Sequence, residues 1–257
     1  LATCMWTKNN SIEEMTMELK RLFVDSKDFV NLQEVDIPEE MNTKIKCGID
    51  FIDDMFGDGE QSGFTPGTIT IFTGAPGAGK STLSLQIANG FASQDVVTAY
   101  NSSEEHISQI KKVADRLGLE APMYVSNNNN IDGVLKQAKD NNVKVLFIDS
   151  LQMMGTSKYD PGSTKATKVV TQKVIQFCKQ NFIVGIVIGH VTKQNVLAGP
   201  LVVKHSVDIH LHLDVCTNAN CLECEIGTRR INLEKNRFGI SNQPQQLFLF
   251  PNGFRKI

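Results

Sequence analysis

One segment constrains the fold of this sequence more than any other, the run of glycines and small residues at 74–82. An apolar, β-branched stretch at 68–73 leads into it, and a segment with helical periodicity follows at 81–91. The glycines let the backbone wrap an anion with its N–H groups, and the start of the helix adds a favourable dipole. The order Gly-x₄-Gly-Lys-Ser matches the phosphate-binding P loop. We therefore predict a strand–loop–helix unit that binds nucleotide phosphates through Gly74, Ala75, Pro76, Gly77, Ala78, Gly79, Lys80, Ser81 and Thr82.

Two oxygen ligands are predicted to add a magnesium ion to this loop. Lys80 is placed to reach the β- and γ-phosphates, and the Ser81 hydroxyl to ligate the metal. The apolar run at 143–149 ends in Asp149, a carboxylate in the position that holds the metal in P-loop enzymes. We therefore expect ATP and Mg²⁺ as cofactors, with Ser81 and Asp149 as metal ligands.

Hydrolysis also requires a group that orients or deprotonates water. We expect it at the end of the strand at 96–100, which we place beside the P-loop strand, because Glu104 and Glu105 follow there. Glu104 is our choice for the catalytic carboxylate, and Glu105 is the second. The alternative is that both acids only begin a helix and complement its dipole.

The chain alternates strands and helices from about residue 43, which predicts an α/β fold. Short apolar runs stand at 68–73, 96–100, 143–149 and 182–189. Helical patterns separate them at 81–91, 104–117, 131–140 and 165–181. This order is typical of a mostly parallel sheet with helices on both faces. After residue 190 we expect no further helix, and strands at 206–213, 228–234 and 246–250 predict an antiparallel C-terminal extension.

A length of 257 residues allows one such domain, at 43–257, preceded by an arm at 1–42. The arm reads as a short amphipathic helix and an acidic linker, and it is a candidate oligomerisation element.

The net charge of −2 conceals an asymmetry along the chain. Residues 1–60 carry a net charge of −8, whereas residues 155–205 hold seven lysines against one acid, a net charge of +6. Such a block of one sign points to a polyanionic partner, unless the lysines only cover solvated helix faces.

The longest apolar run has eight residues, too few to span a bilayer. With no secretory signal in sight, we expect a cytoplasmic protein without a membrane partner.

Three of the six cysteines form a separate cluster, Cys216, Cys221 and Cys224. Together with His212 upstream they have a spacing that a zinc ion would accept. The alternative is a loop with reduced surface cysteines.

Several segments together resemble the RadA/Sms branch-migration ATPases of the RecA–DnaB superfamily. The most specific is Lys-Asn-Arg-Phe-Gly at 235–239, and it is accompanied by motifs at 114–119, 149–152, 189–193, 198–200 and 205–208. The similarity covers about residues 43 to 254. RadA proteins usually begin with a four-cysteine zinc finger and end in a Lon-protease-like domain, neither of which is complete here. This resemblance therefore implies a RecA-like P-loop ATPase core in a short version, of the kind a phage would encode.

The resemblance also implies roles for individual residues. His190 would sense the γ-phosphate, while Lys235 and Arg237 would reach the ATP of the neighbouring subunit in a hexameric ring. Single-stranded DNA would pass between two loops, 154–164 and 191–205, with Gln152 linking them to the metal site. The residues expected to contact DNA are Lys158, Tyr159, Lys165, Lys193 and Lys204.

The function implied is an ATPase stimulated by single-stranded DNA, acting as a 5′–3′ helicase or branch-migration translocase in recombination, repair or replication. A RecA-type filament recombinase and a non-motor ATP-binding regulator are the alternatives.

Overall fold

A computed structural model describes residues 29–190, 201–216 and 227–256 of the chain. The chain divides into two compact units, Leu1–Asn42 and Thr43–Ile257. In the first unit the described residues form two 3-10 turns, Leu32–Glu34 and Glu39–Met41, joined by irregular backbone. Large apolar side chains among these described residues are exposed, Phe29, Leu32 and Ile37 among them. The amphipathic helix predicted near the start of the arm lies outside the described residues.

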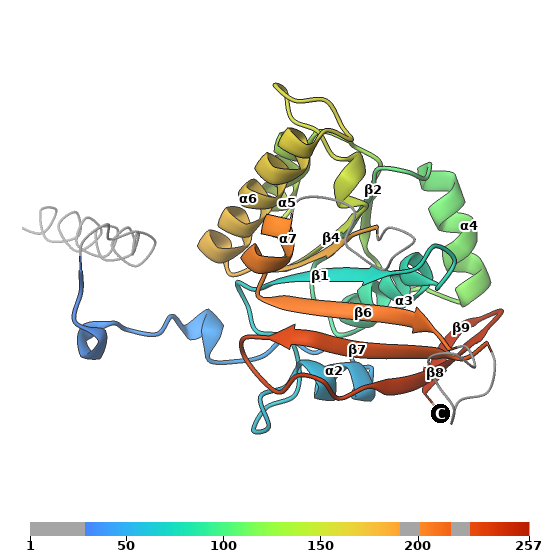
Figure 1. Cartoon of the computed structure of the whole chain (residues 1–257), viewed down its shortest axis with the longest axis horizontal. Helices are drawn as coiled ribbons and strands as arrows, with labels where there is room; N and C mark the ends of the chain where they lie inside the picture. Colours follow the sequence, from blue (N-terminus) through green and yellow to red (C-terminus); the bar gives the residue numbers. More distant parts are fainter. Residues whose placement is uncertain (1–28, 191–200, 217–226, 257) are drawn as a thin grey trace, which may run out of the picture. The chain divides into compact units, whose positions relative to one another are not determined.

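The second unit is built on a sheet whose described strands follow the order β3-β2-β4-β5-β1-β6-β7-β8-β9 (Figure 1). The parallel strands are β1 (Ile69–Gly74), β2 (Thr98–Ser102), β3 (Tyr124–Ser126), β4 (Val145–Asp149), β5 (Val184–Ile188) and β6 (Ile209–Val215). The antiparallel strands are β7 (Arg229–Asn236), β8 (Gln245–Phe250) and β9 (Gly253–Lys256). The predicted α/β class, with a mostly parallel sheet and an antiparallel extension, is confirmed.

Helices cover both faces of the parallel region. On one face, α2 (Asp50–Phe56), α3 (Lys80–Ser93) and α4 (Ile107–Leu117) pack on a core that includes Phe72 and Phe147. On the other, α5 (Ile131–Asp140), α6 (Thr164–Asn181) and α7 (Leu201–Ser206) pack against Ile71 and Ile148. Strands β1, β4 and β5 are buried on both faces, and this explains why they read as continuous apolar runs.

The structure corrects one prediction about strand neighbours. β2 was expected beside the P-loop strand β1, but β4 and β5 lie between them, and β1 pairs with β5 and β6. Each parallel strand is reached through a long crossover, so the local sequence shows where a strand lies but not which strand it joins. Glu104 consequently follows the strand next to β4, which carries Asp149.

Helices also continue after residue 190, contrary to the prediction, because α7 occupies part of the segment expected to be a loop. The short elements α2, β3 and β9 were not predicted either. Three or four residues of β-strand, or two turns of helix, carry too little periodicity to be recognised in isolation.

Two helical glycines give opposite expectations for an alanine substitution. A Cβ at Gly90 in α3 would stand 2.4 Å from the backbone carbonyl oxygen of Cys47, whereas one at Gly133 in α5 would meet only the Asn128 side chain. We expect Gly90→Ala to lower the free energy of unfolding by about 1–3 kcal/mol through overpacking. Gly133→Ala should raise it by up to about 1 kcal/mol, because alanine favours the helix.

Denaturant titration of both variants measures this difference. Equal free energies of unfolding for Gly90→Ala and Gly133→Ala would contradict the close approach of α3 to Cys47.

Candidate functional site

The P loop connects the end of β1 to the start of α3, and two of its glycines have backbone angles that require glycine. Gly77 has φ 76° and Gly79 has φ 104°, both in the left-handed region. Among the described residues nothing lies within 4 Å of a Cβ built on Gly77, whereas one on Gly79 would stand 2.7 Å from the ring of Phe254. The loop is therefore open at Gly77, whereas at Gly79 it packs closely against the ring of Phe254. The Nε of Arg229 on β7 donates to the Ala78 carbonyl at 3.0 Å, a support that the sequence analysis missed.

Lys80 is the first residue of α3 and is buried. Its ammonium donates to the carbonyl oxygens of Gly74 at 2.9 Å and Ala75 at 3.2 Å. Burial lowers the pKa of Lys80, while the negative charges of Asp149 and Glu104 oppose that shift. The predicted cation and the two predicted carboxylates thus lie close enough to interact electrostatically.

Asp149, at the end of β4, is held by a residue that the sequence analysis did not select. The buried Tyr100 on β2 donates its phenol hydrogen to Asp149 Oδ2 at 2.7 Å. Burial, followed by the Asp149 charge, raises the pKa of Tyr100 well above its ordinary value. Tyr100 therefore stays a proton donor and orients the predicted metal ligand Asp149. In the sequence, the only signal for this role of Tyr100 was its hydroxyl group, at a position where the strand is otherwise apolar.

The donors present fit a magnesium ion. Ser81 and Asp149 supply a hydroxyl and a carboxylate oxygen, the hard ligands that Mg²⁺ prefers alongside water and phosphate oxygens. Asp149 is largely buried, and Tyr100 orients its carboxylate. Among the described residues, no cationic side chain lies at hydrogen-bond distance from this carboxylate to neutralise it.

Glu104 and His190 are brought together although they come from different strands. Nε2 of His190, which follows β5, lies 2.8 Å from Glu104 Oε1, and the Ser150 hydroxyl donates to the same oxygen. Glu105 shows a raised pKa, mainly from desolvation and then from the charges of Asp149 and Glu104. The predicted water-activating carboxylate and the predicted γ-phosphate sensor are therefore direct neighbours.

Gln152 connects this region to the first predicted DNA loop. Its side-chain oxygen accepts from the His190 backbone N–H at 3.3 Å, and its carbonyl accepts from the Gly162 N–H at 2.9 Å. A change at His190 thus has a short path through Gln152 to the loop at 154–164.

Lys235 and Arg237 lie at the opposite end of the sheet from the P loop. Register pairs Thr70 with Ile209, and Ile209 with Asn236, so the end of β7 is level with the beginning of β1, with β6 between them. Lys235 donates to the Val207 carbonyl at 2.6 Å, and Arg237 pairs with the buried Asp208 at 3.3 Å. Desolvation, followed by the neighbouring Arg237 charge, lowers the pKa of Lys235. The length of β1, roughly 17 Å, separates both cations from the P loop of their own chain.

The basic residues predicted to contact DNA are only partly described. Lys158 and Lys165 are exposed, and Lys158 Nζ lies 5.8 Å from the centre of the half-buried Tyr159 ring. Lys193 and the side chain of Lys204 lie outside the described residues. Two lysines of α6 are paired with acids, Lys173 with Asp132 and Lys179 with Asp208.

The described residues give the predicted zinc site no support. Cys216 is buried directly after β6, and both ring nitrogens of His212 are engaged, one with Thr73 and the other with Asp214. His212 is thus no free ligand, contrary to the prediction. Cys221 and Cys224 lie outside the described residues, and within the described ones no three histidine, cysteine or acidic side chains form a metal cluster.

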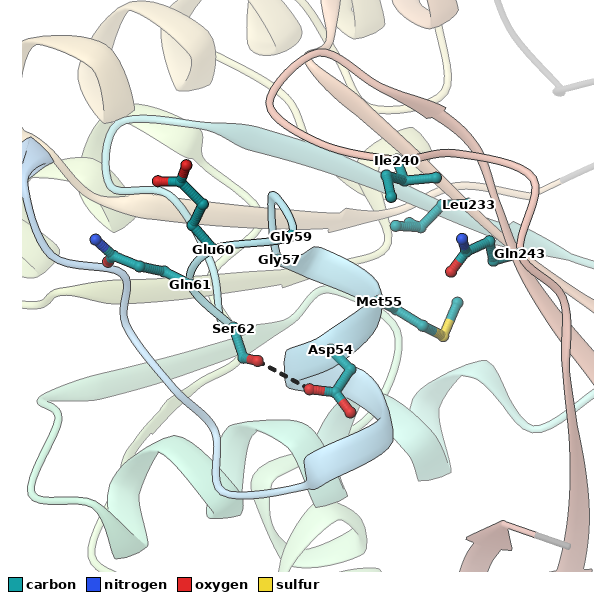
Figure 2. A pocket seen from close by; sticks show the side chains of 10 residues that line it. All are labelled: Asp54, Met55, Gly57, Gly59, Glu60, Gln61, Ser62, Leu233, Ile240 and Gln243. Atoms are coloured by element: carbon teal, nitrogen blue, oxygen red, sulfur yellow. Dashed lines mark hydrogen bonds between the residues drawn. The ribbon is translucent and has the colours of Figure 1, made fainter.

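A cavity of about 260 Å³ lies apart from the P loop, between α2 with the loop after it and the segment that follows β7 (Figure 2). Its lining includes Leu233, Ile240 and the acids Asp54 and Glu60. Asp54 accepts a hydrogen bond from Ser62 at 2.8 Å. None of the predicted site residues lines this cavity.

Comparison with known proteins identifies the family. The family model described as "ATPase family associated with various cellular activities (AAA)" matches residues 70–215, more than half of the chain. The chain belongs to this ATPase family. The match begins in β1 and ends in β6, so it contains the P loop, Glu104, Asp149 and His190, but neither Lys235 nor Arg237.

Among curated proteins, this AAA chain is similar to the DNA repair protein RadA of Chlamydia pneumoniae, with 35% identity over 76% of the chain and 42% of that protein. It is 33% identical to RadA of Mycobacterium tuberculosis over 82% of the chain and 42% of that protein. The RadA resemblance predicted from the motifs is confirmed, and the chain spans less than half the length of these relatives.

The fold is similar to that of the KaiC-like protein PH0186 from Pyrococcus horikoshii. The TM-score is 0.68 at 18% identity, covering 84% of this chain and 99% of that one. Within the described residues, no helix is both long and apolar enough to cross a membrane.

Removal of the Tyr100 hydroxyl tests the metal site of this AAA chain. Tyr100→Phe keeps the buried ring but leaves Asp149 without the phenol that orients it. We expect the Mg²⁺ concentration for half-maximal ATP hydrolysis to rise by roughly 10- to 100-fold, the usual effect of losing a residue that orients a metal ligand.

Tyr124→Phe, on the exposed edge strand β3, is the matched control and should behave as wild type. An unchanged Mg²⁺ requirement in Tyr100→Phe would contradict the assignment of Asp149 and Ser81.

Proposed function

We propose that this chain is an ATP-driven motor on single-stranded DNA, a helicase or branch-migration translocase whose ATP sites form between adjacent copies in a ring of six. The observation that carries the proposal is the separation of the catalytic groups to opposite ends of the sheet. Lys80, Asp149 and Glu104 gather at the carboxyl end of the parallel strands, while Lys235 and Arg237 lie at the other end. One ATP site that contains all of these groups then requires two copies of the chain in head-to-tail contact.

Each group has a defined task in this mechanism. The P-loop backbone and Lys80 bind the phosphates, and Ser81 and Asp149 hold Mg²⁺, which neutralises charge on the phosphate oxygens. Glu104 orients or deprotonates the attacking water. Lys235 and Arg237 of the adjacent copy stabilise the charge that develops on the transferred phosphoryl group.

The contact between His190 and Glu104 supports a path from hydrolysis to DNA. Loss of the γ-phosphate would change the surroundings of this pair, and Gln152 joins His190 to the loop at 154–164. Sequential changes of this loop and of the loop after His190 would move the strand through the ring, with the 5′–3′ direction as our working assumption. The relatives named DNA repair protein RadA support a role in repair or recombination.

Mixing of inactive variants tests the composite site. Lys235→Ala and Glu104→Gln should each abolish ATP hydrolysis while still binding ATP. In an equal mixture, about a quarter of the head-to-tail interfaces would combine an intact Glu104 with an intact Lys235, so ATPase activity should return to about that fraction.

The matched control is a mixture of Lys235→Ala with Arg237→Ala. Both lesions then lie on the same side of the interface, so no interface is complete and no activity should return. Absence of rescue in the first mixture, with native mass showing mixed oligomers, would refute catalysis in trans.

The loops proposed to contact DNA predict how the affinity for single-stranded DNA depends on salt concentration. The double variant Lys158→Ala/Lys165→Ala should bind single-stranded DNA more weakly. The negative slope of log affinity against log salt concentration should also become shallower, by about 0.7 for each lysine removed. Fluorescence anisotropy at several salt concentrations measures the slope, alongside ATPase rates with and without DNA.

Lys112→Ala, which removes an exposed lysine from α4, should leave the slope unchanged. A wild-type ATPase rate indifferent to single-stranded DNA would contradict the motor and favour a regulatory ATP-binding protein.

A further inference from the structure

A buried polar cluster lies directly behind the P loop and takes no part in the mechanism above. Thr73, His210 and His212 are 1%, 4% and 7% exposed, and all three belong to central strands of the sheet. Parallel pairing sets Thr73 of β1 opposite His212 of β6. Since residues two apart on a strand share a face, His210 and His212 point to the same side. Polar side chains at such positions lower stability unless they are hydrogen-bonded.

The Thr73 hydroxyl joins the two imidazole rings. Its oxygen lies 2.6 Å from His210 Nε2 and 2.7 Å from His212 Nδ1, while its contact with the Leu211 carbonyl is longer, at 3.4 Å. The outer nitrogens of both rings face carboxylates. His212 Nε2 lies 3.0 Å from Asp214 Oδ1, and His210 Nδ1 lies 2.9 Å from Glu234 Oε2, an ion-pair contact without hydrogen-bond alignment.

The direction of the hydrogen bonds follows from the protons available. Asp214 can only accept, so His212 Nε2 carries the hydrogen and its Nδ1 accepts from the Thr73 hydroxyl. Thr73 in turn accepts from His210 Nε2–H.

Thr73 is the last residue before Gly74, whose carbonyl accepts the Lys80 ammonium. A clamp on the Thr73 side chain therefore restrains the backbone that holds Lys80. Because Lys80 is expected to meet charge that develops on the transferred phosphoryl group, a small displacement affects the rate more than the binding of ATP.

We propose that His210 and His212 are positioning residues for ATP hydrolysis, which act through the Thr73 hydroxyl on the first turn of the P loop. The inference rests on the proposed ATPase function, but not on DNA binding.

The first test removes the bridging oxygen and keeps the shape of the side chain. In Thr73→Val, kcat for DNA-independent ATP hydrolysis should fall about tenfold or more, with KM for ATP within about threefold of wild type. Thr73→Ser, which restores the hydroxyl, should recover most of the rate. Binding of a fluorescent ATP analogue reports whether each variant is folded.

Thr70→Val is the matched control, because Thr70 is a buried threonine of the same strand whose hydroxyl has no hydrogen-bond partner among the described residues. It should hydrolyse ATP at close to the wild-type rate. An unchanged kcat in Thr73→Val, or equal losses in Thr70→Val and Thr73→Val, would overturn the inference. A wild-type chain that hydrolyses no ATP would overturn both proposals, whereas hydrolysis indifferent to DNA would overturn the motor alone.

The second test acts on His210 itself. His210→Phe keeps a buried ring but cannot donate to the Thr73 hydroxyl, so kcat for DNA-independent ATP hydrolysis should fall as in Thr73→Val, with KM for ATP within about threefold of wild type. Binding of the fluorescent ATP analogue reports whether this variant is folded. An unchanged kcat in a folded His210→Phe variant would overturn the role assigned to His210.

Discussion

Parallel strand pairing is the constraint on which the rest of this structure depends. It brings the carboxyl ends of β1, β2, β4 and β5 to one edge of the sheet. The P loop, Glu104, Asp149 and His190 each lie at the end of one of these strands or just after it, so residues as much as 86 positions apart come within hydrogen-bond distance. Because the strands are buried on both faces, none can slip in register without exposing apolar side chains and separating these groups. The geometry of the site is therefore a property of the sheet as much as of its loops.

Much of this arrangement could be predicted from sequence because its signals are local. The P loop needs glycine at Gly77 and Gly79 for backbone angles that other residues rarely adopt, and Asp149 ends an unbroken apolar run. The helices α5 and α6 were predicted to within a residue of their observed starts, since their apolar periodicity is long. These features depend on neighbours in the chain.

What could not be predicted depends on contacts across the sheet. The position of β2 beside β4 rather than β1 follows from the crossovers, which leave no mark on the strand sequence. Tyr100 reads as one more core aromatic until β2 pairs with β4 and its hydroxyl meets Asp149. His212 suggested a metal ligand because of the cysteines after it, but the pairing of β6 with β1 commits it to Thr73.

The packing of Phe254 behind Gly79 has a consequence for the order of folding. The Phe254 backbone N–H also donates a hydrogen bond to Gln86 Oε1, and 168 residues separate the two along the chain. During synthesis the P loop and α3 leave the ribosome long before β9 exists, so the loop lacks its rear wall for most of that time. The rear support of the phosphate loop therefore forms only after β9 has been synthesised.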